Sequence, residues 1–129
     1  MVNYLGKTGE YEAFVASRIS PHAMRSNSIR AVHIAFGLTT EAGEFADILK
    51  KGITKNLLWD ELDKVNMKEE LGDLLFYIQD AATMLDTSIE ELAAINEAKL
   101  TKRYPNGFTK EATDNRNLEA ERAVLEGDN

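Results

Sequence analysis

The sequence predicts an all-α fold, and three observations support that prediction. Apolar residues recur every three or four positions over two long stretches, which is the spacing of one helix face. The two prolines, Pro21 and Pro105, lie outside those stretches, and no segment shows the alternating pattern of a strand. Because 129 residues is the usual length of one domain, we expect a single all-α domain over residues 1–129.

Breaker and capping residues give the bounds of the first helices. We expect a short helix over residues 8–19, ended by Pro21. A long helix is expected over about 28–51, where Gly52 has the position of a C-terminal cap. A linker over residues 53–59 follows it.

Similar signals give the bounds of the later helices. A second long helix is expected to start at Asp60, a good N-cap residue, and to reach about residue 85. Ser88 and Glu91 form a Ser-x-x-Glu capping box that opens a helix ending near Tyr104. The charge-rich tail over 110–129 predicts a marginal helix that needs a partner surface. Because the helices are long and their apolar faces wide, we expect a helical bundle completed by homo-oligomerisation.

Composition and charge exclude several classes of protein. The net charge of −7 argues against a nucleic-acid polymer as partner, because such binding needs a basic surface to neutralise phosphates. The chain has no cysteine, which excludes disulfides and thiolate metal sites. The N-terminal stretch lacks the pattern of a signal peptide, and no apolar run is long enough to span a bilayer. We therefore expect a cytoplasmic protein with no membrane partner.

Two glutamates of the first long helix lie on its apolar face. Helical residues advance by about 100° each, so positions three, four and seven apart share a face. Glu44 lies about 60° from Glu41, and Ile34, Phe45 and Ile48 lie within about 40° of Glu41. Both carboxylates are therefore expected to face the core, where an unpaired charge is costly.

The second long helix repeats this arrangement. Asp73 lies about 60° from Glu70, and Leu74, Tyr77 and Ala81 lie within about 40° of Glu70. Two pairs of carboxylates are thus expected to point inward from two helices joined by a short linker. Four clustered carboxylates repel one another, so a cation must lie among them.

A divalent metal ion is the cation that this pattern favours. Arginine or lysine partners, or salt bridges on solvated helix faces, would explain one such pair, but two pairs on consecutive apolar faces favour a metal. Oxygen ligands alone indicate Mg²⁺, with Mn²⁺ as a substitute, over zinc. A di-iron site is disfavoured, because neither pair carries the expected Glu-x-x-His. We predict that the metal ligands are Glu41, Glu44, Glu70 and Asp73.

Donors that could meet an anion occur on other helices. Asn96, Lys99 and Arg103 share one face of the helix that Ser88 opens. A triphosphate held against metal ions needs such donors, although a cationic helix edge is the commoner explanation for this pattern. His33 lies near the Glu44 side of its helix and is a further candidate contact to a base or phosphate, although a lone helical histidine is more often part of the core.

Three sequence segments resemble a known family. GLTTEAGEFADILKK and KEELGDLLFYI are similar to the MazG-like, all-α nucleoside triphosphate pyrophosphohydrolases, whose motif is Glu-x-x-Glu, a spacer and Glu-x-x-Asp. Here the motif is Glu41-Ala-Gly-Glu44, a spacer of 25 residues and Glu70-Leu-Gly-Asp73. The segment NEAKLTKRYPNGFT also resembles the family's closing motif, in which the matching positions approach the nucleotide: Asn96, Lys99, Arg103 and Tyr104. The resemblance covers about residues 28–109, and the short form with its tail looks most like versions carried by bacteriophages.

The resemblance implies an activity and an assembly. It implies hydrolysis of a (deoxy)nucleoside triphosphate between the α and β phosphates, in homodimers or dimers of dimers whose neighbouring chains complete each pocket. The four carboxylates would then be catalytic as well as metal-binding, with Glu41 or Glu44 as the general base. Glu69 adds a carboxylate beside the motif, about 100° from Glu70, and is not expected to be a primary ligand.

Several related functions stay open at the level of sequence. An all-α dUTPase or dCTPase, or a phosphoribosyl-ATP pyrophosphohydrolase, would differ in its base pocket. A nucleotide-binding helical regulator without activity is the non-enzymatic alternative. If a phage encodes the chain, its compartment would be the host cytoplasm.

Overall fold

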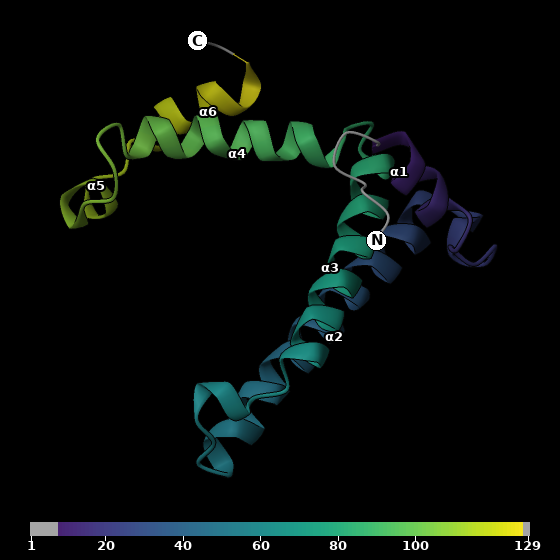
Figure 1. Cartoon of the computed structure of the whole chain (residues 1–129). Coiled ribbons are helices and arrows are strands. Elements are labelled where there is room, and N and C mark those ends of the chain that lie inside the picture. Colours follow the sequence, from purple (N-terminus) through teal and green to yellow (C-terminus); the bar gives the residue numbers. More distant parts are fainter. Residues whose placement is uncertain (1–7, 128–129) are drawn as a thin grey trace. The chain divides into compact units, whose positions relative to one another are not determined.

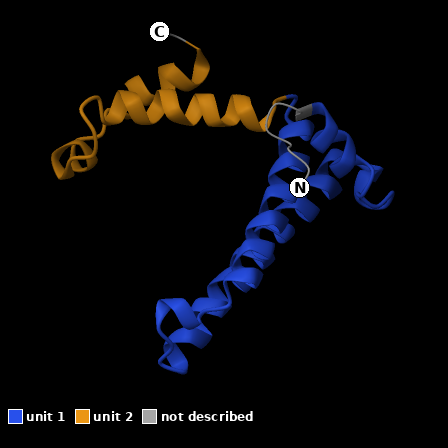
Figure 2. Cartoon of the chain, in the orientation of Figure 1, with its two compact units in different colours: residues 1–86 blue, residues 87–129 orange. Residues whose placement is uncertain are grey.

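The computed structural model describes residues 8–127, and within that range all regular structure is helical (Figure 1). This confirms the all-α prediction. Residues 1–7 and 128–129 lie outside the described range, so the expectation that the N-terminal stretch is not a signal peptide falls partly on residues that the structure does not describe. The chain divides into two compact units, residues 1–86 and 87–129 (Figure 2), and each is described by itself. None of the described helices is long and apolar enough to cross a membrane.

Two long helices, α2 (Asn27–Thr54) and α3 (Lys64–Met84), lie side by side and dominate the first unit (Figure 1). The Ser26 side chain caps α2 by accepting a hydrogen bond from the Ile29 backbone N–H at 3.2 Å. Such a cap satisfies one of the backbone donors that every helix leaves unpaired in its first turn. Both long helices predicted from the apolar spacing are therefore present.

Gly52 lies inside α2 and does not cap it, so this part of the prediction is wrong. The helix continues to Thr54. Gly52 is buried, and a Cβ atom added there would lie 2.4 Å from the Leu62 side chain. The glycine therefore serves a close approach between α2 and the segment before α3, and not the end of the helix.

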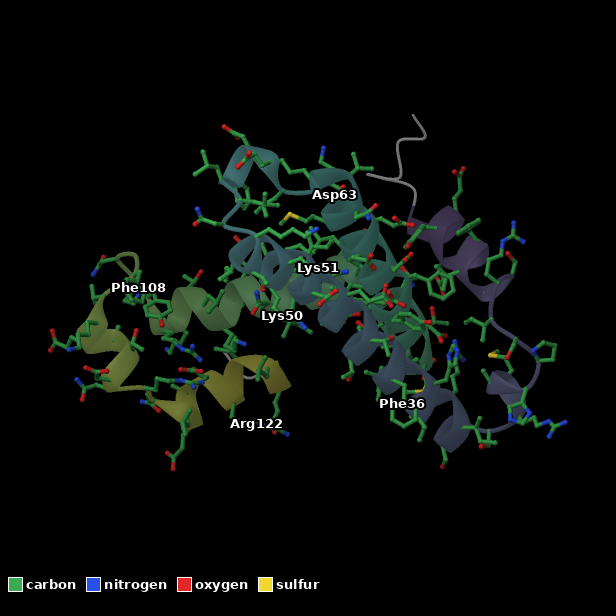
Figure 3. The ribbon with its side chains drawn as sticks, turned by 90° about the horizontal axis from the view of Figure 1, so that it is seen from below. Phe36, Lys50, Lys51, Asp63, Phe108 and Arg122 are labelled. Atoms are coloured by element: carbon green, nitrogen blue, oxygen red, sulfur yellow. The ribbon has the colours of Figure 1, made fainter. Side chains whose placement is uncertain are left out.

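The predicted start of α3 at Asp60 is also wrong. Asp60 belongs to a short 3₁₀ turn, η2 (Trp59–Glu61), and its carboxylate pairs with Lys64 at 3.1 Å. Asp63 is the N-cap residue, and its carboxylate accepts from the Asn66 N–H at 3.1 Å (labelled in Figure 3). Asp60 and Asp63 both have the chemistry of an N-cap residue. Because Asp60 lies within the 3₁₀ turn, Asp63 is the residue that caps α3.

Helix α1 (Thr8–Ala16) and the 3₁₀ turn η1 (Ala23–Arg25) pack on the two long helices. Helix α1 ends three residues before the predicted bound at residue 19. At this end the Ser17 hydroxyl donates to the Phe14 carbonyl at 2.6 Å. The small apolar core of this unit is made here: Val15, Ile19 and Ala23 are buried, and Tyr11 and Phe76 pack against them.

A buried ion pair joins α2 to α3. The Asp80 side chain is fully buried, and its Oδ1 accepts from Arg30 Nε at 2.8 Å and from Nη2 at 2.5 Å. The two residues are 50 positions apart, so helix periodicity could not reveal their pairing. An ion pair of this kind makes the register of the two helices costly to change, because a shift would leave a buried charge unpaired.

The second unit contains α4 (Ile89–Arg103), which packs against α6 (Leu118–Glu126) (Figure 1). Ser88 caps α4 as predicted, and its Oγ accepts from the Glu91 N–H at 3.1 Å. In the predicted capping box the Glu91 carboxylate would accept from the Ser88 backbone N–H. In the structure this carboxylate accepts from the Thr87 hydroxyl at 2.6 Å. The predicted tail helix is present as two pieces, α6 and the short α5 (Lys110–Asp114).

Candidate functional site

Three of the four predicted metal ligands meet where α2 faces α3. Glu41, Glu44 and Glu70 each offer a carboxylate oxygen, and these oxygens all lie within 4.8 Å of one another. One turn of α2 supplies the first two, and α3 supplies the third. Three oxygens at this spacing could coordinate one divalent cation.

Asp73 is close to this cluster but is not part of the three-oxygen set. Its negative charge raises the pKa of both Glu41 and Glu70, which places it within electrostatic reach of them. Glu69 raises the pKa of Glu70 in the same way and is exposed. Asp73, the predicted fourth ligand, therefore lies near the three clustered glutamates without being one of them.

The burial of the four carboxylates differs from the sequence expectation. Glu41 and Glu70 are half-buried, whereas Glu44 and Asp73 are exposed in the single chain. The expectation that all four face a closed core is therefore wrong for one chain. Two helices cover each other along one line only, so side chains about 60° from that line face outward.

Burial and mutual repulsion act on the two half-buried glutamates. Partial burial raises the pKa of Glu41, and the charges of Glu44 and Asp73 raise it further. The pKa of Glu70 is also raised, first by burial and then by Glu44 and Glu41. Holding these groups ionised near neutral pH therefore costs free energy, which a bound cation would offset.

An aromatic pair lies beside the carboxylates. The ring centroids of His33 and Tyr77 are 5.6 Å apart in an edge-on arrangement, and burial followed by the charge of Glu41 raises the pKa of Tyr77. The His33 Nδ1 is buried and has no hydrogen-bond partner within residues 8–127. A substrate contact by His33 stays a prediction.

Gly37 explains how Tyr77 reaches this position. A Cβ atom at Gly37 would lie 2.3 Å from the Tyr77 ring, so the aromatic ring rests on bare backbone of α2. The glycine lies one turn before Glu41 and sets the close approach of the two helices at the carboxylate cluster.

The predicted phosphate donors belong to α4 in the second unit. Asn96 is exposed, while Lys99, Arg103 and Tyr104 are half-buried. Asn96 and Tyr104 line a cavity of about 480 Å³ along α4, and Arg103 lines another of about 460 Å³ near the start of α5 and α6. The contact of these residues with a nucleotide stays a prediction.

Arg103 has a partner that the sequence reasoning missed. Its guanidinium donates to the Glu121 carboxylate of α6, with Nε at 2.9 Å from Oε1 and Nη2 at 2.5 Å from Oε2. Arg116 binds the same carboxylate, and Glu121 is only 4% exposed. A usable signal existed, because Glu121 shares a helix face with Leu118 and Val124, as Glu41 does with its apolar neighbours.

The lysines that end α2 bind a neighbouring carboxylate. Lys50 and Lys51 (labelled in Figure 3) contact Asp47 at 3.1 Å and 2.7 Å, respectively. Their positive charges also suit the C-terminal end of a helix. These contacts account for both lysines without a ligand.

Comparison with known proteins identifies the family. The model of the MazG nucleotide pyrophosphohydrolase domain matches residues 33–108, more than half of the chain. The chain belongs to this family. It is also similar to the Gene 37 protein of Mycobacterium phage L5, with 31% identity over 100 residues that cover 76% of this chain and 88% of the relative. No solved structure matches significantly.

Family membership confirms the predicted resemblance and its phage-type form. It supports nucleotide pyrophosphohydrolase activity and the use of a divalent metal in general. The matched range includes every site residue predicted from sequence, from His33 to Tyr104. Glu121 and Arg116 lie beyond it, in the segment that follows residue 108.

Proposed function

We propose that this MazG-family chain hydrolyses (deoxy)nucleoside triphosphates at the bond between the α and β phosphates. The products would be a nucleoside monophosphate and pyrophosphate. The observation that carries the proposal is the cluster of Glu41, Glu44 and Glu70, whose oxygens lie within 4.8 Å of one another on facing helices. The family match supports the reaction class.

The residues present fit Mg²⁺ as the cofactor, with Mn²⁺ as a substitute. The donor set is oxygen only, which hard divalent cations prefer. The pKa values of Glu41 and Glu70 are raised by burial and by neighbouring carboxylates, so these groups gain from a cation beside them. Glu41, Glu44, Glu70 and Asp73 would hold the metal. When bound, such ions neutralise a triphosphate and make a water molecule more acidic.

The chain's own residues supply the remaining steps. Glu41 or Glu44 would accept a proton from the attacking water. The pKa of Glu41 is raised by its partial burial, which makes its carboxylate a better proton acceptor. Lys99 and Arg103 would donate hydrogen bonds to phosphate oxygens and stabilise the charge of the departing pyrophosphate. Asn96, Tyr104 and His33 would orient the nucleotide.

The proposed assembly is a homodimer or a dimer of dimers. Large apolar side chains of the α2–α3 pair are exposed in the single chain, including Leu71 at 53% and Phe36 at 70%. Phe36 is labelled in Figure 3. Burial of such side chains by a second copy would be favourable. Light scattering of the purified protein tests this proposal, and a monomer at all concentrations would contradict it.

We propose the cytoplasm, and for a phage-encoded chain the host cytoplasm, as the site of action. The similarity to a mycobacteriophage protein supports the phage setting. Neither a membrane nor a nucleic-acid polymer has a part in the proposed reaction.

A panel of nucleotides incubated with Mg²⁺ tests the proposed function. It should contain the canonical ribo- and deoxynucleoside triphosphates, dUTP, several damaged nucleotides and phosphoribosyl-ATP, with the released pyrophosphate measured. A single preference for dUTP or dCTP would indicate the dUTPase or dCTPase alternative. Turnover of phosphoribosyl-ATP alone would indicate a phosphoribosyl-ATP pyrophosphohydrolase. Tight nucleotide binding without product after long incubation would indicate a regulator and overturn the proposal.

A further inference from the structure

A buried carboxylate in the second unit is shared by two arginines. Both Glu121 oxygens accept from Arg103, at 2.9 Å and 2.5 Å, and both accept from Arg116, at 3.3 Å and 2.8 Å. The Glu121 side chain is 5% exposed and that of Arg103 is 16% exposed. Paired N–H donors on each side of one carboxylate fix the orientation of both guanidinium groups.

The neighbour of Arg103 is held in a similar way. The Tyr104 hydroxyl lies 3.1 Å from Thr113 Oγ1 of α5, and the Arg103 guanidinium lies 5.7 Å from the centre of the Tyr104 ring. Two consecutive residues at the end of α4 therefore each have a partner in the segment after residue 108. That segment lies outside the range that the family model matches.

We propose that Glu121 and Thr113 are positioning residues, which hold Arg103 in the orientation that meets the phosphates and Tyr104 in the orientation that meets the nucleotide. The proposal rests on the proposed function, which gives Arg103 and Tyr104 a role at the substrate. The segment over residues 109–127 is then a fixed support for the phosphate donors of this chain.

The geometry suits such a support. Glu121 uses the Nε and Nη2 groups of Arg103, so the Nη1 group is not used by this carboxylate. Two guanidinium groups around one carboxylate keep a net positive charge, which an anion would neutralise. Arg103, Arg116 and Glu121 line the same cavity of about 460 Å³, a volume within the range of small-molecule sites.

A purely structural role would give a different result. If Glu121 only held α6 against α4, its loss would lower stability but would leave the KM and the pyrophosphate Kd of the folded protein unchanged. If Glu121 acts through Arg103, its effect must disappear once the guanidinium is gone. A double-mutant cycle separates the two cases.

The test uses Glu121→Gln in the full chain, alone and together with Arg103→Ala. Glu126→Gln is the matched control, because Glu126 lies on the same helix and pairs with Arg122 on an exposed surface (Arg122 is labelled in Figure 3). For each variant, KM and kcat are measured with the best nucleotide of the panel. Binding of pyrophosphate with Mg²⁺ is measured by calorimetry, which needs no turnover.

We expect Glu121→Gln to raise KM and the pyrophosphate Kd by about tenfold in the wild-type background. In the Arg103→Ala background, Glu121→Gln should change KM and the pyrophosphate Kd by less than about twofold. Glu126→Gln should leave both constants unchanged in the wild-type and the Arg103→Ala backgrounds. An equal loss in the two backgrounds, or no difference between Glu121→Gln and Glu126→Gln, would overturn the proposal.

A second variant protects the test if Glu121→Gln does not fold, which circular dichroism would reveal. Thr113→Val keeps the side-chain shape and removes the partner of the Tyr104 hydroxyl. We expect KM to rise by about threefold, and no rise in a Tyr104→Phe background. An unchanged KM in the wild-type background would then overturn the proposal.

The same measurements distinguish this inference from the proposed function. Wild-type turnover with no coupling between Glu121 and Arg103 would reject the positioning role and leave the function in place. Pyrophosphate binding that shows the coupling, without turnover of any nucleotide, would reject hydrolysis and support the positioning of Arg103. Absence of both turnover and pyrophosphate binding would reject both proposals.

Discussion

The carboxylates of Glu41 on α2 and Glu70 on α3 face each other, with oxygens within 4.8 Å of one another and of Glu44. Burial and neighbouring negative charges raise the pKa of both groups. Ionising both near neutral pH therefore works against the packing of the two helices. A divalent cation between them would turn this repulsion into attraction.

Mg²⁺ should therefore stabilise the folded chain. At a free concentration about 100 times its Kd, a ligand that binds only the folded state adds about 2.7 kcal/mol to the free energy of unfolding. We expect the melting temperature to rise with Mg²⁺ in the wild type, and the rise to be lost in Glu44→Gln and strongly reduced in Asp73→Asn. Differential scanning calorimetry with and without a chelator measures this effect.

The neighbouring Glu69→Gln is the control for that experiment. It removes one carboxylate next to Glu70 but none of the three clustered oxygens, so it should keep most of the Mg²⁺ response. An equal response in Glu44→Gln and the wild type would contradict the assignment of the metal site.

The Glu121 carboxylate should make the second unit sensitive to acid. Hydrogen bonds from Arg103 and then Arg116 lower its pKa from the ordinary 4.5 to about 2. A lowered pKa in the folded state means that the unfolded state binds more protons, so stability rises with pH across this window. The contribution is fully present above about pH 4.5 and is lost as the pH falls toward 2.

Thermal unfolding between about pH 6 and about pH 2 checks this prediction. The upper limit lies above the ordinary pKa of 4.5, and the lower limit lies at the pKa of about 2 in the folded state. The melting temperature of Glu121→Gln should fall less steeply across the acid window than that of the wild type. Glu126→Gln, on the exposed side of α6, should follow the wild-type curve more closely. A wild-type slope in Glu121→Gln would show that this ion pair does not control the acid response.

Gly37→Ala should weaken the packing of α2 on α3. A Cβ atom at this position would lie 2.3 Å from the Tyr77 ring, so the aromatic ring must move. Overpacking of this kind costs about 1–3 kcal/mol. Gly43→Ala is the matched control in the same helix, because its added Cβ would have no described atom within 4 Å beyond its chain neighbours and the adjoining helix backbone.

Urea unfolding of the two alanine variants gives the comparison. Alanine favours a helix over glycine by about 1 kcal/mol, so Gly43→Ala should be neutral or stabilising. A loss of stability as large in Gly43→Ala as in Gly37→Ala would show that the contact with Tyr77 is not the cause.

Arg30→Met should be strongly destabilising. It leaves the fully buried Asp80 without its guanidinium partner, at a cost of about 3–5 kcal/mol. Lys64→Met removes the exposed ion pair with Asp60 and should cost less than about 1 kcal/mol. The double variant Arg30→Met/Asp80→Leu should recover much of the loss in chemical unfolding, and no recovery would contradict the proposed burial cost.

The two long helices and the three clustered glutamates could be predicted from the sequence. Apolar spacing gave α2 and α3, and the carboxylates on that spacing gave Glu41, Glu44 and Glu70, which the structure brings together. Local signals were less reliable at the helix ends. Asp60 and Asp63 both have the chemistry of a cap, and only the turn at Trp59–Glu61 decides between them.

Long-range pairings were beyond the sequence. The partners Arg30 and Asp80 are 50 residues apart, and no helix period relates them. The exposure of Glu44 was also mispredicted, because an apolar face indicates what a helix could bury and not whether one chain supplies the cover. A second copy of the chain, as proposed above, would supply it.

The most direct test of the central claim is the identity of the products. The purified chain should be incubated with Mg²⁺ and its preferred nucleoside triphosphate, and the phosphorus compounds followed by ³¹P NMR. We expect nucleoside monophosphate and pyrophosphate in equal amounts, with turnover lowered by at least about 100-fold in Glu44→Gln, which should remain helical by circular dichroism. Nucleoside diphosphate and phosphate as products, or undiminished turnover in Glu44→Gln, would contradict it.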